Sequence, residues 1–527
     1  MAKIPSVMSH SFSQVPKAEI PRSSFDRSSG RKTTFNSGYL VPVFCDEVLP
    51  GDTFNLTATF FARLATPLHP IMDNMRLTSF FFFVPFRLLW DNWQKFMGEQ
   101  DNPGDSTDFL VPQMLAPAGG YAANTIYDYF ALPTQVAGYA HWSFPFRAYN
   151  LIYNQWFRDQ NLQNSVTVLK GDTNDPPATY TLLRRGKRHD YFTSCLPWPQ
   201  KGPGVDIPLG TSAPVVSTSP GAAIQFASNA NPAALTNLNL AGGANSGVTQ
   251  ASATTAGQMT LATAGSHMMA DLTNATAATI NQLRQAFQIQ KLYERDARGG
   301  TRYTEIIRAH FNVTSPDARL QRPEYLGGGQ SPINLYSVPQ TSATDSQPTP
   351  QANLAAYGTV SGSNHGFTHS FTEHGIVLGL ISVQADLNYQ QGLERFWSRR
   401  TKFDFYWPAL SHIGEQAVLN KEIYTQGTAA DDQVFGYQER YAEYRYKPST
   451  ITGEFRSNFA QSLDTWHLAQ DYSALPALNA NFIVDNPPIA RAIAVLNEPE
   501  FIMDSFMRLR CARPMPVYGV PGLIDHF

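Results

Sequence analysis

The chain has 527 residues, a formal net charge of −3 at pH 7 and only 15% charged residues. Proline (37) and glycine (36) are abundant and aromatic residues reach 12%, a composition typical of many turns, short strands and long ordered loops. It argues against helical bundles, coiled coils and α/β enzymes. The near-neutral charge does not indicate a general nucleic-acid binder, so any basic surface must be local.

The cysteine content and the hydropathy pattern narrow the class of protein further. Cys45, Cys195 and Cys511 are widely separated and form no CxxC pair. We therefore expect neither a disulfide framework nor a zinc site, and folding in a reducing compartment. No stretch has about eighteen uninterrupted apolar residues, and the N-terminus lacks the apolar core of a secretory signal.

Residues 1–36 form a basic segment in which serine and proline separate the charges and large hydrophobic residues are few. Such a segment buries too little apolar surface to fold alone, so we expect an extended arm that lies on a partner or on the body of the protein. Contact with a polyanion is one interpretation, and an ordinary solvated terminus, which the charge count alone favours, is the other. The cations of this arm are Lys3, Lys17, Arg22, Arg27, Arg31 and Lys32.

The most aromatic stretch of the chain spans residues 69–97. Aromatic residues favour strands and Pro85 would break a helix, so we expect a central strand over 77–84 that is buried on both faces. A short amphipathic helix is predicted to follow at 87–97. Four consecutive phenylalanines are predicted to lie in the core: Phe80, Phe81, Phe82 and Phe83.

Two earlier segments, 39–48 and 54–64, are also predicted to be strands, and the turn signal Pro-Gly-Asp lies between them. Three strands at this spacing suggest a β-sandwich or a barrel. The segment 146–161 carries aromatic and apolar residues at helical spacing, which is typical of a core-facing helix.

The densest basic cluster of the chain lies at 184–188 and is followed by three aromatic residues. The aromatic residues indicate an ordered loop, whereas a flexible tail would indicate a localisation signal. These aromatics are compatible with base stacking and equally with burial in the core. The cluster consists of Arg184, Arg185, Lys187 and Arg188, and its aromatic neighbours are Tyr191, Phe192 and Trp198.

Two segments differ in composition from the rest of the chain. The segment 210–280 is rich in small uncharged residues, with Asp271 as its one charge, and cannot form an independent core. We expect it to be mobile or to be ordered by pairing with copies of itself. A second loop insertion, rich in Gly, Ser, Pro and Gln, is predicted for 327–364.

The last part of the chain returns to patterns typical of regular elements. Helices are predicted where apolar residues recur every three or four positions, and a strand buried on both faces is predicted where they are continuous. The predicted elements are helices at 282–298 and 304–310, a buried strand at 375–383, and strands or strand edges within 396–408, 434–446 and 501–510.

Few residues of this chain have the spacing in sequence that catalytic or metal-binding residues usually have. His365, His369 and Glu373 share one face of an extended chain, with His374 beside them. Strand neighbours four residues apart are separated by about 13 Å, too far to share one ion, so solvated or core histidines are favoured. No metal and no other cofactor are expected.

A pair of aspartates, Asp404 and Asp464, is a candidate for a glycosidase-like site. We favour the alternative that both are polar residues that lie between aromatic residues on a strand of the sandwich. The sequence motifs of serine hydrolases, zinc proteases and nucleotide-binding loops are absent. No catalytic residue is predicted.

Five long blocks of the sequence, in the right order, resemble the major capsid protein of gokushoviruses, a branch of the small single-stranded DNA bacteriophages of the Microviridae. The resemblance covers nearly the whole chain, apart from 210–280 and about 330–362, where that family itself varies. The blocks are MDNMRLTSFFFFVPFRLLWDNW, RRGKRHDYFTSCLPWPQKG, SPDARLQRPEYLGG, HSFTEHGIVLGLISVQADLNYQQGLERFW and RPMPVYGVPGLIDHF.

The resemblance implies a mainly β fold, an eight-stranded antiparallel viral jelly roll with long loop insertions and several helices, formed by the single domain 37–527. Sixty copies would close a T = 1 icosahedral capsid around a circular single-stranded DNA genome, without enzymatic activity. In that family the large insertion forms protrusions at the threefold axes for host attachment, which corresponds here to 210–280.

The resemblance also implies the partners. These are other copies of the chain through five-, three- and twofold contacts, the single-stranded DNA genome, a small basic DNA-packaging protein, an internal scaffolding protein, a DNA pilot protein and a bacterial surface receptor. The subunits would fold and assemble in the cytoplasm of the bacterial host and end in the virion capsid. The cations of the arm and of 184–188 are the candidates for DNA contact.

Two other classes of protein are alternatives to a capsid subunit. Jelly rolls also occur in lectins, so the tryptophans and tyrosines are compatible with a carbohydrate-binding or carbohydrate-cleaving protein. A tail-fibre or spike protein would show internal repeats, and the sequence has none of fixed period. A structural capsid subunit is the favoured interpretation.

Overall fold

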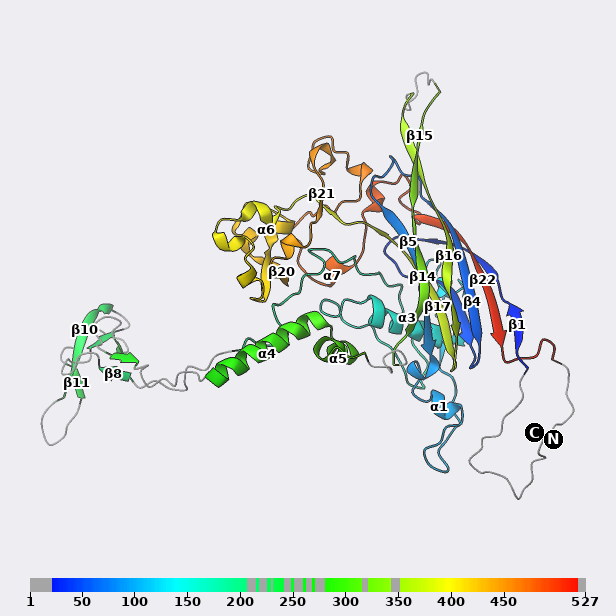
Figure 1. Ribbon diagram of the computed structural model, residues 1–527, viewed down its shortest axis with the longest axis horizontal. Helices are drawn as coiled ribbons and strands as arrows, with labels where there is room; N and C mark the ends of the chain where they lie inside the picture. The colour runs from blue at the N-terminus through cyan, green and yellow to red at the C-terminus, as the bar shows by residue number, and fades with distance from the viewer. Residues whose placement is uncertain are drawn as a thin grey trace. The chain divides into compact units, whose positions relative to one another are not determined.

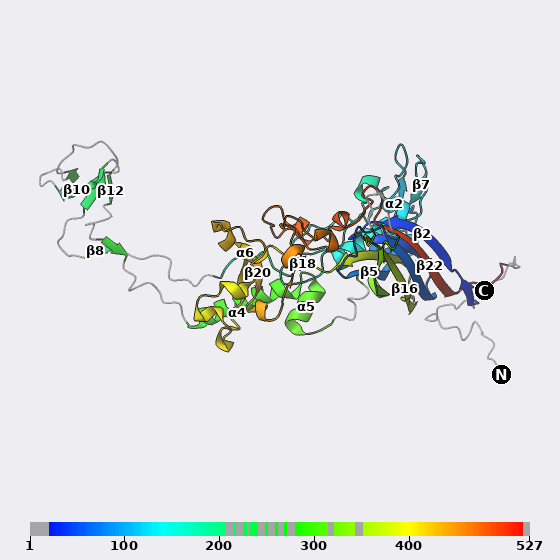
Figure 2. The ribbon, with the colours of Figure 1, turned by 90° about the horizontal axis from the view of Figure 1, so that it is seen from above.

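The computed structural model describes residues 21–205, 215–217, 225–228, 231–240, 248–250, 259–261, 268–270, 280–314, 321–342 and 351–519. The chain divides into two compact units. One consists of Met1–Pro199 with Gly299–Phe527, and the other of Gln200–Arg298. The first unit contains two antiparallel sheets that pack face to face (Figure 1, Figure 2).

The larger sheet has the strand order β1-β22-β4-β16-β15, and β2 also pairs with β22. Because β1 and β2 pair with successive stretches of β22, they form one outer strand that is interrupted at 27–28. The described part of the predicted arm, 21–36, thus lies extended on the body of the protein. The strands are β1 (Ser23–Asp26), β2 (Ser29–Phe35), β4 (Thr53–Leu64), β15 (Asn334–Pro339), β16 (Leu354–Ser370) and β22 (Phe501–Arg513).

The smaller sheet has the order β14-β5-β17-β3, so the phenylalanine-rich strand β5 lies inside it, as predicted. Its neighbour β17 is buried at every residue, which confirms the prediction of a strand covered on both faces. The predicted strands at 39–48 and 54–64 are confirmed as β3 and β4. The strands are β3 (Val41–Val48), β5 (Met75–Pro85), β14 (Glu324–Pro332) and β17 (Gly375–Ala385).

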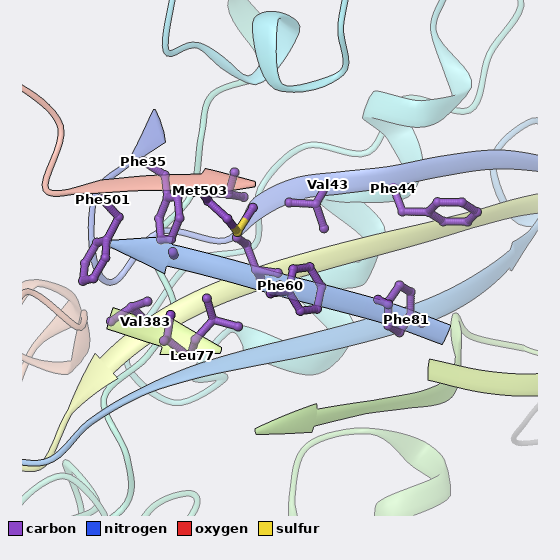
Figure 3. Close-up of a cluster of buried hydrophobic side chains, with 14 of the residues drawn as sticks. Phe35, Val43, Phe44, Phe60, Leu77, Phe81, Val383, Phe501 and Met503 are labelled. Atoms are coloured by element: carbon purple, nitrogen blue, oxygen red, sulfur yellow. The ribbon is translucent and has the colours of Figure 1, made fainter. Parts of the chain in front are cut away.

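The side chains of β5 alternate between two hydrophobic clusters, one on each face of the smaller sheet. Phe81 and Phe83 belong to the cluster between the two sheets, and Figure 3 shows Phe81 of the smaller sheet and Phe60 of the larger sheet in this core. Phe82 is buried in the cluster on the opposite face. The prediction that Phe80 lies in the core is wrong in part, because its ring is half-buried and borders a cavity beneath Arg185.

The order in which the chain visits the two sheets is that of a jelly roll. Strands β2, β4, β16 and β22 lie in the larger sheet, whereas β3, β5, β14 and β17 lie in the smaller one. The predicted mainly β, antiparallel fold is therefore confirmed. The sandwich has more strand segments than the expected eight, because β1 continues the line of β2 and β15 adds an outer strand.

The segment 327–364 is not a loop insertion, because β14, β15 and the first half of β16 occupy most of it. Gly328 and Gly329 pair with β5 in the smaller sheet. A Cβ atom on Gly328 would clash with the carbonyl oxygen of Ser79, and one on Gly329 would lie 2.7 Å from the ring of His365. These glycines permit close strand packing, whereas their composition alone suggested a flexible loop.

The predicted helices differ in how well they match the structure. Those at 282–298 and 304–310 are confirmed as α4 (Ile280–Gly299) and α5 (Tyr303–Phe311). The predicted helix at 146–161 is shorter, because α3 (Phe144–Ile152) continues as one π-helical turn, η3 (Tyr153–Phe157).

The predicted helix at 87–97 is wrong. Its place is taken by η2 (Phe86–Leu88) and α1 (Trp93–Phe96), with Trp90 between them. The Trp90 side chain is fully buried and its indole nitrogen donates to Asp172, so the chain must leave the helical path to place this ring in the core.

The late strand predictions are confirmed in part. The segment 501–510 lies within β22, and 434–446 contains β20 (Val434–Glu439). The segment 396–408 is instead three 3₁₀ turns, η6 (Arg395–Ser398), η7 (Lys402–Asp404) and η8 (Pro408–Leu410). No strand of the described chain pairs with this segment, and its aromatic side chains remain exposed.

The remaining elements are short. In the first unit they are β6 (Gln113–Leu115), α2 (Ile126–Tyr129), β7 (Ala140–Trp142), η4 (Pro177–Thr179), β18 (Asn388–Tyr389), β19 (Glu415–Leu419), α6 (Asn420–Ile423), η9 (Ala429–Asp432), η10 (Ala442–Tyr444), β21 (Ser449–Thr450), η11 (Gly453–Phe455), η12 (Asp464–Trp466), α7 (Ala480–Ile483) and η13 (Ile489–Arg491).

The three cysteines are free thiols. Among the described helices, none has the length and apolar character needed to span a membrane.

The second unit contains the whole of the compositionally unusual segment 210–280 and α4 up to Arg298. Its described backbone forms short antiparallel ladders, in a four-stranded sheet of order β11-β10-β9-β12 and a pair β13-β8. The strands are β8 (Val215–Ser217), β9 (Gln225–Ser228), β10 (Asn231–Leu240), β11 (Val248–Gln250), β12 (Met259–Leu261) and β13 (Met268–Ala270). The segment thus belongs to a unit separate from the sandwich.

The buried ring of His365 makes the stability of the sandwich sensitive to acid. Its two nitrogens lie 2.8 Å from the hydroxyl oxygens of Ser79 and Ser331, and burial lowers its pKa. Because the folded state then binds a proton less readily than the unfolded state, this contribution to stability is complete above the ordinary histidine pKa of about 6.5 and declines as the pH falls below it. Thermal unfolding between pH 7.5 and 5 should show this decline.

The variant His365→Gln removes the titrating group, so its unfolding midpoint should lie below that of the parent at pH 7.5, and the gap should narrow toward pH 5. The exposed His412 offers a matched control, since His412→Gln should follow the parent at every pH. A gap between His365→Gln and the parent that stays constant with pH would contradict this role of His365.

Candidate nucleic-acid interface

The basic segment 184–188 is held as a short extended strand between two parts of the backbone. Arg184 bridges to Tyr39 and Gly186 bridges to Val484, both in antiparallel fashion. The amide of Lys187 donates to the carbonyl oxygen of Ile483 at 2.7 Å. The four cations therefore project from an ordered stretch of chain, as the sequence indicated.

Two of the four cations are engaged with protein groups. Arg184 stacks on the ring of Tyr39 at 4.0 Å and donates to the side chain of Asn486 at 2.8 Å. Arg188 forms an ion pair with Asp386 at 2.8 Å. These two side chains help to hold the segment in place and have less capacity left for a ligand.

The other two cations, Arg185 and Lys187, rest on aromatic rings. The guanidinium of Arg185 lies 4.9 Å from the ring centroid of Phe80, and the ammonium of Lys187 lies 4.5 Å from that of Phe482. Burial lowers the pKa of Arg185 to about 10 and also lowers the pKa of Lys187, so Arg185 stays charged at neutral pH. Neither forms an ion pair with any carboxylate of the described chain.

These two side chains border a cavity of about 590 Å³ on the face of the smaller sheet that points away from the core. The exposed aromatic groups of its wall are Trp156, 37% exposed, and Tyr325, 44% exposed. Aromatic faces beside cations form the combination that binds single-stranded nucleic acid. The cavity is lined by Phe80, Phe82, Trp156, Phe157, Arg158, Asp159, Arg185, Gly186, Lys187, Arg188, His189, Tyr325 and Ile483.

A second group of cations lies beside the same aromatic wall. Arg322 stacks on Trp156 at 4.5 Å, and the Nε atom of Arg158 is buried without a hydrogen-bond partner in the described chain. Burial lowers the pKa of both groups, and repulsion from Arg302 lowers it further. Mutual repulsion of buried cations favours an anionic ligand at this wall.

Several carboxyl groups lie near these cations, among them Asp159 on the cavity wall and the buried Asp485. Burial raises the pKa of Asp485 to about 6, although Lys187, Arg185 and Arg184 attract its charge. Its Oδ2 atom has no hydrogen-bond partner within the described residues. Because Asp485 loses its charge as the pH falls through about 6, the net positive charge beside the cavity then increases.

The four described cations of the N-terminal arm all contact protein groups, two on strand β3 of the smaller sheet and two on strands of the larger sheet. Arg27 forms an ion pair with Asp46 at 2.9 Å, and Arg31 donates to the carbonyl oxygen of Pro42. Arg22 donates to Thr53, whereas the exposed Lys32 lies 3.6 Å from Asp504. Lys3 and Lys17 lie outside the described residues.

The aromatic residues that follow the basic cluster do not line this cavity. Tyr191 and Phe192 are buried in a third hydrophobic cluster, and Trp198 is half-buried. The exposed aromatic residues of the cavity are instead Trp156 and Tyr325, which come from other segments of the chain. Helical spacing had assigned Trp156 to a core-facing helix, no element had been predicted at Tyr325, and no local signal connects either residue with the cations.

The histidines and carboxylates of 365–374 separate into different contacts. His369 lies 3.8 Å from Glu324, and Glu373 forms an ion pair with Arg87 at 2.7 Å. The ring of His374 packs against Trp93. Among the described residues, no three His, Cys, Asp or Glu side chains converge as metal ligands would.

The two candidate glycosidase residues belong to turns. Asp404 accepts hydrogen bonds from the amides of Thr401 and Arg400, which lower its pKa. Asp464 begins the turn η12. A general acid would need a raised pKa, so Asp404 is suited to capping its turn and not to proton donation.

Comparison with known proteins gives consistent results over almost the whole chain. The model of the family described as "Capsid protein (F protein)" matches residues 13–523. Capsid protein VP1 of Bdellovibrio phage phiMH2K is 51% identical, over 98% of this chain and 98% of its own length. VP1 of Chlamydia phage 1 is 48% identical over 99% of each chain, and VP1 of Spiroplasma virus 4 is 37% identical over 98% and 97%.

These matches give no support to the carbohydrate-binding alternative. They show that the chain is a structural protein whose copies assemble with one another into a capsid. They agree with the jelly-roll topology and with the gokushovirus resemblance of the sequence. The chain belongs to the F-protein family of phage capsid proteins.

Proposed function

We propose that sixty copies of this chain close a T = 1 icosahedral shell around a circular single-stranded DNA genome, and that the cavity beside Arg185 and Lys187 contacts this DNA. The observation that carries the DNA contact is the pairing of cations that lack an ion-pair partner in the described chain with exposed aromatic groups in one cavity. The capsid family and the jelly-roll topology support the shell.

The mode of contact follows from the chemistry of the wall. Tyr325 and the exposed part of Trp156 offer flat apolar surfaces on which a base can stack, at about 1–3 kcal/mol per base. Arg185 and Lys187 provide positive charge for the neighbouring phosphates. None of these groups reads the edge of a base in a defined pattern, so we expect binding with little sequence preference.

The lack of a net positive charge on the subunit points to another partner inside the shell. A net charge of −3 leaves the shell unable to neutralise a genome, so a small basic DNA-packaging protein is expected inside it. An internal scaffolding protein and a DNA pilot protein would act during assembly in the host cytoplasm.

The segment 210–280 is proposed to form threefold surface protrusions that bind a receptor on the bacterial host. Its place in a unit apart from the sandwich supports a role separate from the shell wall. Its small uncharged residues suit close contacts between copies.

Electron microscopy of particles purified from producing cells, combined with nuclease treatment, tests the function directly. Uniform closed shells with protected single-stranded DNA are the expected result. Shells of another symmetry, or particles whose nucleic acid is duplex or RNA, would contradict it.

The double variant Arg185→Gln with Lys187→Gln should weaken binding of soluble subunits to a thymidine oligonucleotide about tenfold or more at about 0.1 M salt. Loss of two phosphate contacts should also lower the slope of log affinity against log salt by about 1.4. Fluorescence anisotropy across a salt series measures both quantities.

A control for that double variant removes the same charge elsewhere. Lys95→Gln with Lys170→Gln changes two cations outside the cavity and should leave affinity and slope near those of the parent. Thermal unfolding of each variant shows whether it is folded. Equal losses in the two double variants would mean that net charge, and not this cavity, governs the binding.

The affinity for single-stranded DNA should increase as the pH falls from 7.5 to 5.5, because Asp485, with a pKa of about 6, becomes neutral beside the cations. A coupling of roughly fivefold is expected for one charge at this distance. Asp485→Asn should bind with the higher affinity throughout this range.

The variant His189→Gln separates the effect of Asp485 from that of the imidazole on the cavity wall. Its affinity should keep the pH dependence of the parent. A dependence that disappears in His189→Gln and persists in Asp485→Asn would assign the effect to the histidine.

Replacement of residues 215–275 by a short Gly/Ser linker should leave the sandwich folded and the shell closed, because these residues belong to a separate unit. The particles should lose their surface protrusions and their attachment to host cells, as seen by electron microscopy and by adsorption assays. Loss of soluble expression would instead show that the segment is needed for the fold.

A further inference from the structure

An exposed aromatic surface lies on the segment that was predicted to be a strand and forms 3₁₀ turns. Its six aromatic residues are all at least half exposed, from 50% for Trp407 to 70% for Trp397. Tyr444 and Tyr446 extend it at 50% and 48% exposure. We call this the aromatic surface; its six residues are Phe396, Trp397, Phe403, Phe405, Tyr406 and Trp407.

The side chains of the aromatic surface are contiguous. The guanidinium of Arg399 lies 5.5 Å from the ring centroid of Phe396, 5.4 Å from that of Phe405 and 4.5 Å from that of Tyr444. Tyr406 packs edge to face on Tyr441. Arg399 thus connects two rings of the segment with Tyr444, and the contacts of Trp397 with Phe396 and of Tyr406 with Tyr444 extend this patch.

The support beneath the aromatic surface is rigid. Arg395 forms an ion pair with the buried Glu422 at 3.1 Å, and Arg399 lies 3.9 Å from Glu443. Glu443 in turn accepts a hydrogen bond from Gln416 of β19 at 2.6 Å. The exposed rings therefore rest on a connected polar network, which lowers the entropy cost of binding a partner.

The area of the aromatic surface exceeds that of an ordinary exposed patch. Eight aromatic side chains, each about half exposed, present roughly 800 Å² of surface, since a buried aromatic side chain covers about 150–250 Å². The largest apolar patch of a typical monomer is about 300–600 Å². A stable protein–protein interface buries about 800 Å² on each partner, so this patch has the size of one side of such an interface.

A cavity of about 420 Å³ opens within this surface, with Phe396, Trp397, Tyr444 and Tyr446 on its wall. A hollow of this kind can receive a projecting side chain of a partner, as the central pockets of protein interfaces do. The aromatic surface thus combines a wide apolar area with a cavity that can hold a side chain of the partner.

The charges around the aromatic surface favour a protein partner over nucleic acid. Residues 394–447 contain eight basic and eight acidic side chains, although the aromatic segment 395–407 itself carries four cations and one carboxylate. Several of the eight cations are paired, with Arg445 on Glu439 and Lys447 on Glu394 in addition to the pairs of Arg395 and Arg399. In contrast, Arg185 and Lys187 at the cavity of the smaller sheet have no such pairs.

We propose that the aromatic surface is an assembly interface that docks onto a second copy of this chain. The inference rests on the self-assembly of the capsid family, which supplies a partner of the same kind to every subunit. Its size matches one side of a stable interface, and the carboxylate pairs of Arg395, Arg399, Arg445 and Lys447 limit repulsion between two copies. In the assembled shell these rings are buried.

The test places a photo-reactive group at the most exposed ring. Full-length chain with Trp397→p-benzoylphenylalanine is produced in cells that make particles, and the purified particles are irradiated. The expected product has twice the 58.4 kDa mass of the chain and forms by linkage of residue 397 to a second copy. A cross-link to DNA or to a smaller protein, or no cross-link at all, would overturn the proposal.

A second measurement uses charge to disrupt the interface. Trp397→Asp with Phe405→Asp should reduce the fraction of chain in particles at least tenfold, with the soluble subunits keeping the unfolding midpoint of the parent. The conservative pair Trp397→Phe with Phe405→Tyr should restore assembly. Normal particle yield from the aspartate pair would overturn the proposal, whereas failure of the parent itself to form shells would overturn the proposed function instead.

Discussion

Burial of β5 on both of its faces is the constraint on which the rest of the structure depends. Alternate side chains of this strand enter two hydrophobic clusters, with Phe81 and Phe83 between the sheets and Phe82 on the opposite side. Each fully buried phenylalanine contributes about 1.5–3 kcal/mol, but only when another element covers it. The larger sheet covers one face, and α3 with its π-helical extension covers the other.

The elements around α3 leave part of their face of β5 uncovered, and the candidate DNA site lies at this uncovered part. Phe80 stays half-buried beside Trp156, and Arg185 covers its ring, whereas Phe82 is buried beneath the cavity. A cation over an aromatic face is stabilised by the ring and keeps its charge for an anion. The rings that hold the subunit together thus also form the floor of the cavity that is proposed to receive the genome.

The use of charge explains why a capsid subunit can be nearly neutral and still carry local basic sites. Most cations of the first unit are paired with carboxylates or backbone oxygens, as Arg27, Arg188 and Arg395 are. Pairing keeps long-range repulsion between copies low, which suits a closed shell. Arg185 and Lys187, which form no ion pair in the described chain, lie on one cavity wall, whereas Arg395, Arg399, Arg445 and Lys447 beside the aromatic surface are paired with carboxylates.

The sequence by itself determined the elements whose burial pattern is local: the strands β5, β17 and β22, the helices α4 and α5, and the family. It also located the basic cluster at 184–188. Only the tertiary structure decided that 327–364 is paired strand, that 396–408 is not, and that Arg185 and Lys187 differ from Arg184 and Arg188. The physical reason is that periodicity records which side of an element is covered, whereas strand pairing, ion pairing and the cavity walls depend on partners such as Tyr325 and Asp386, more than a hundred residues away along the chain.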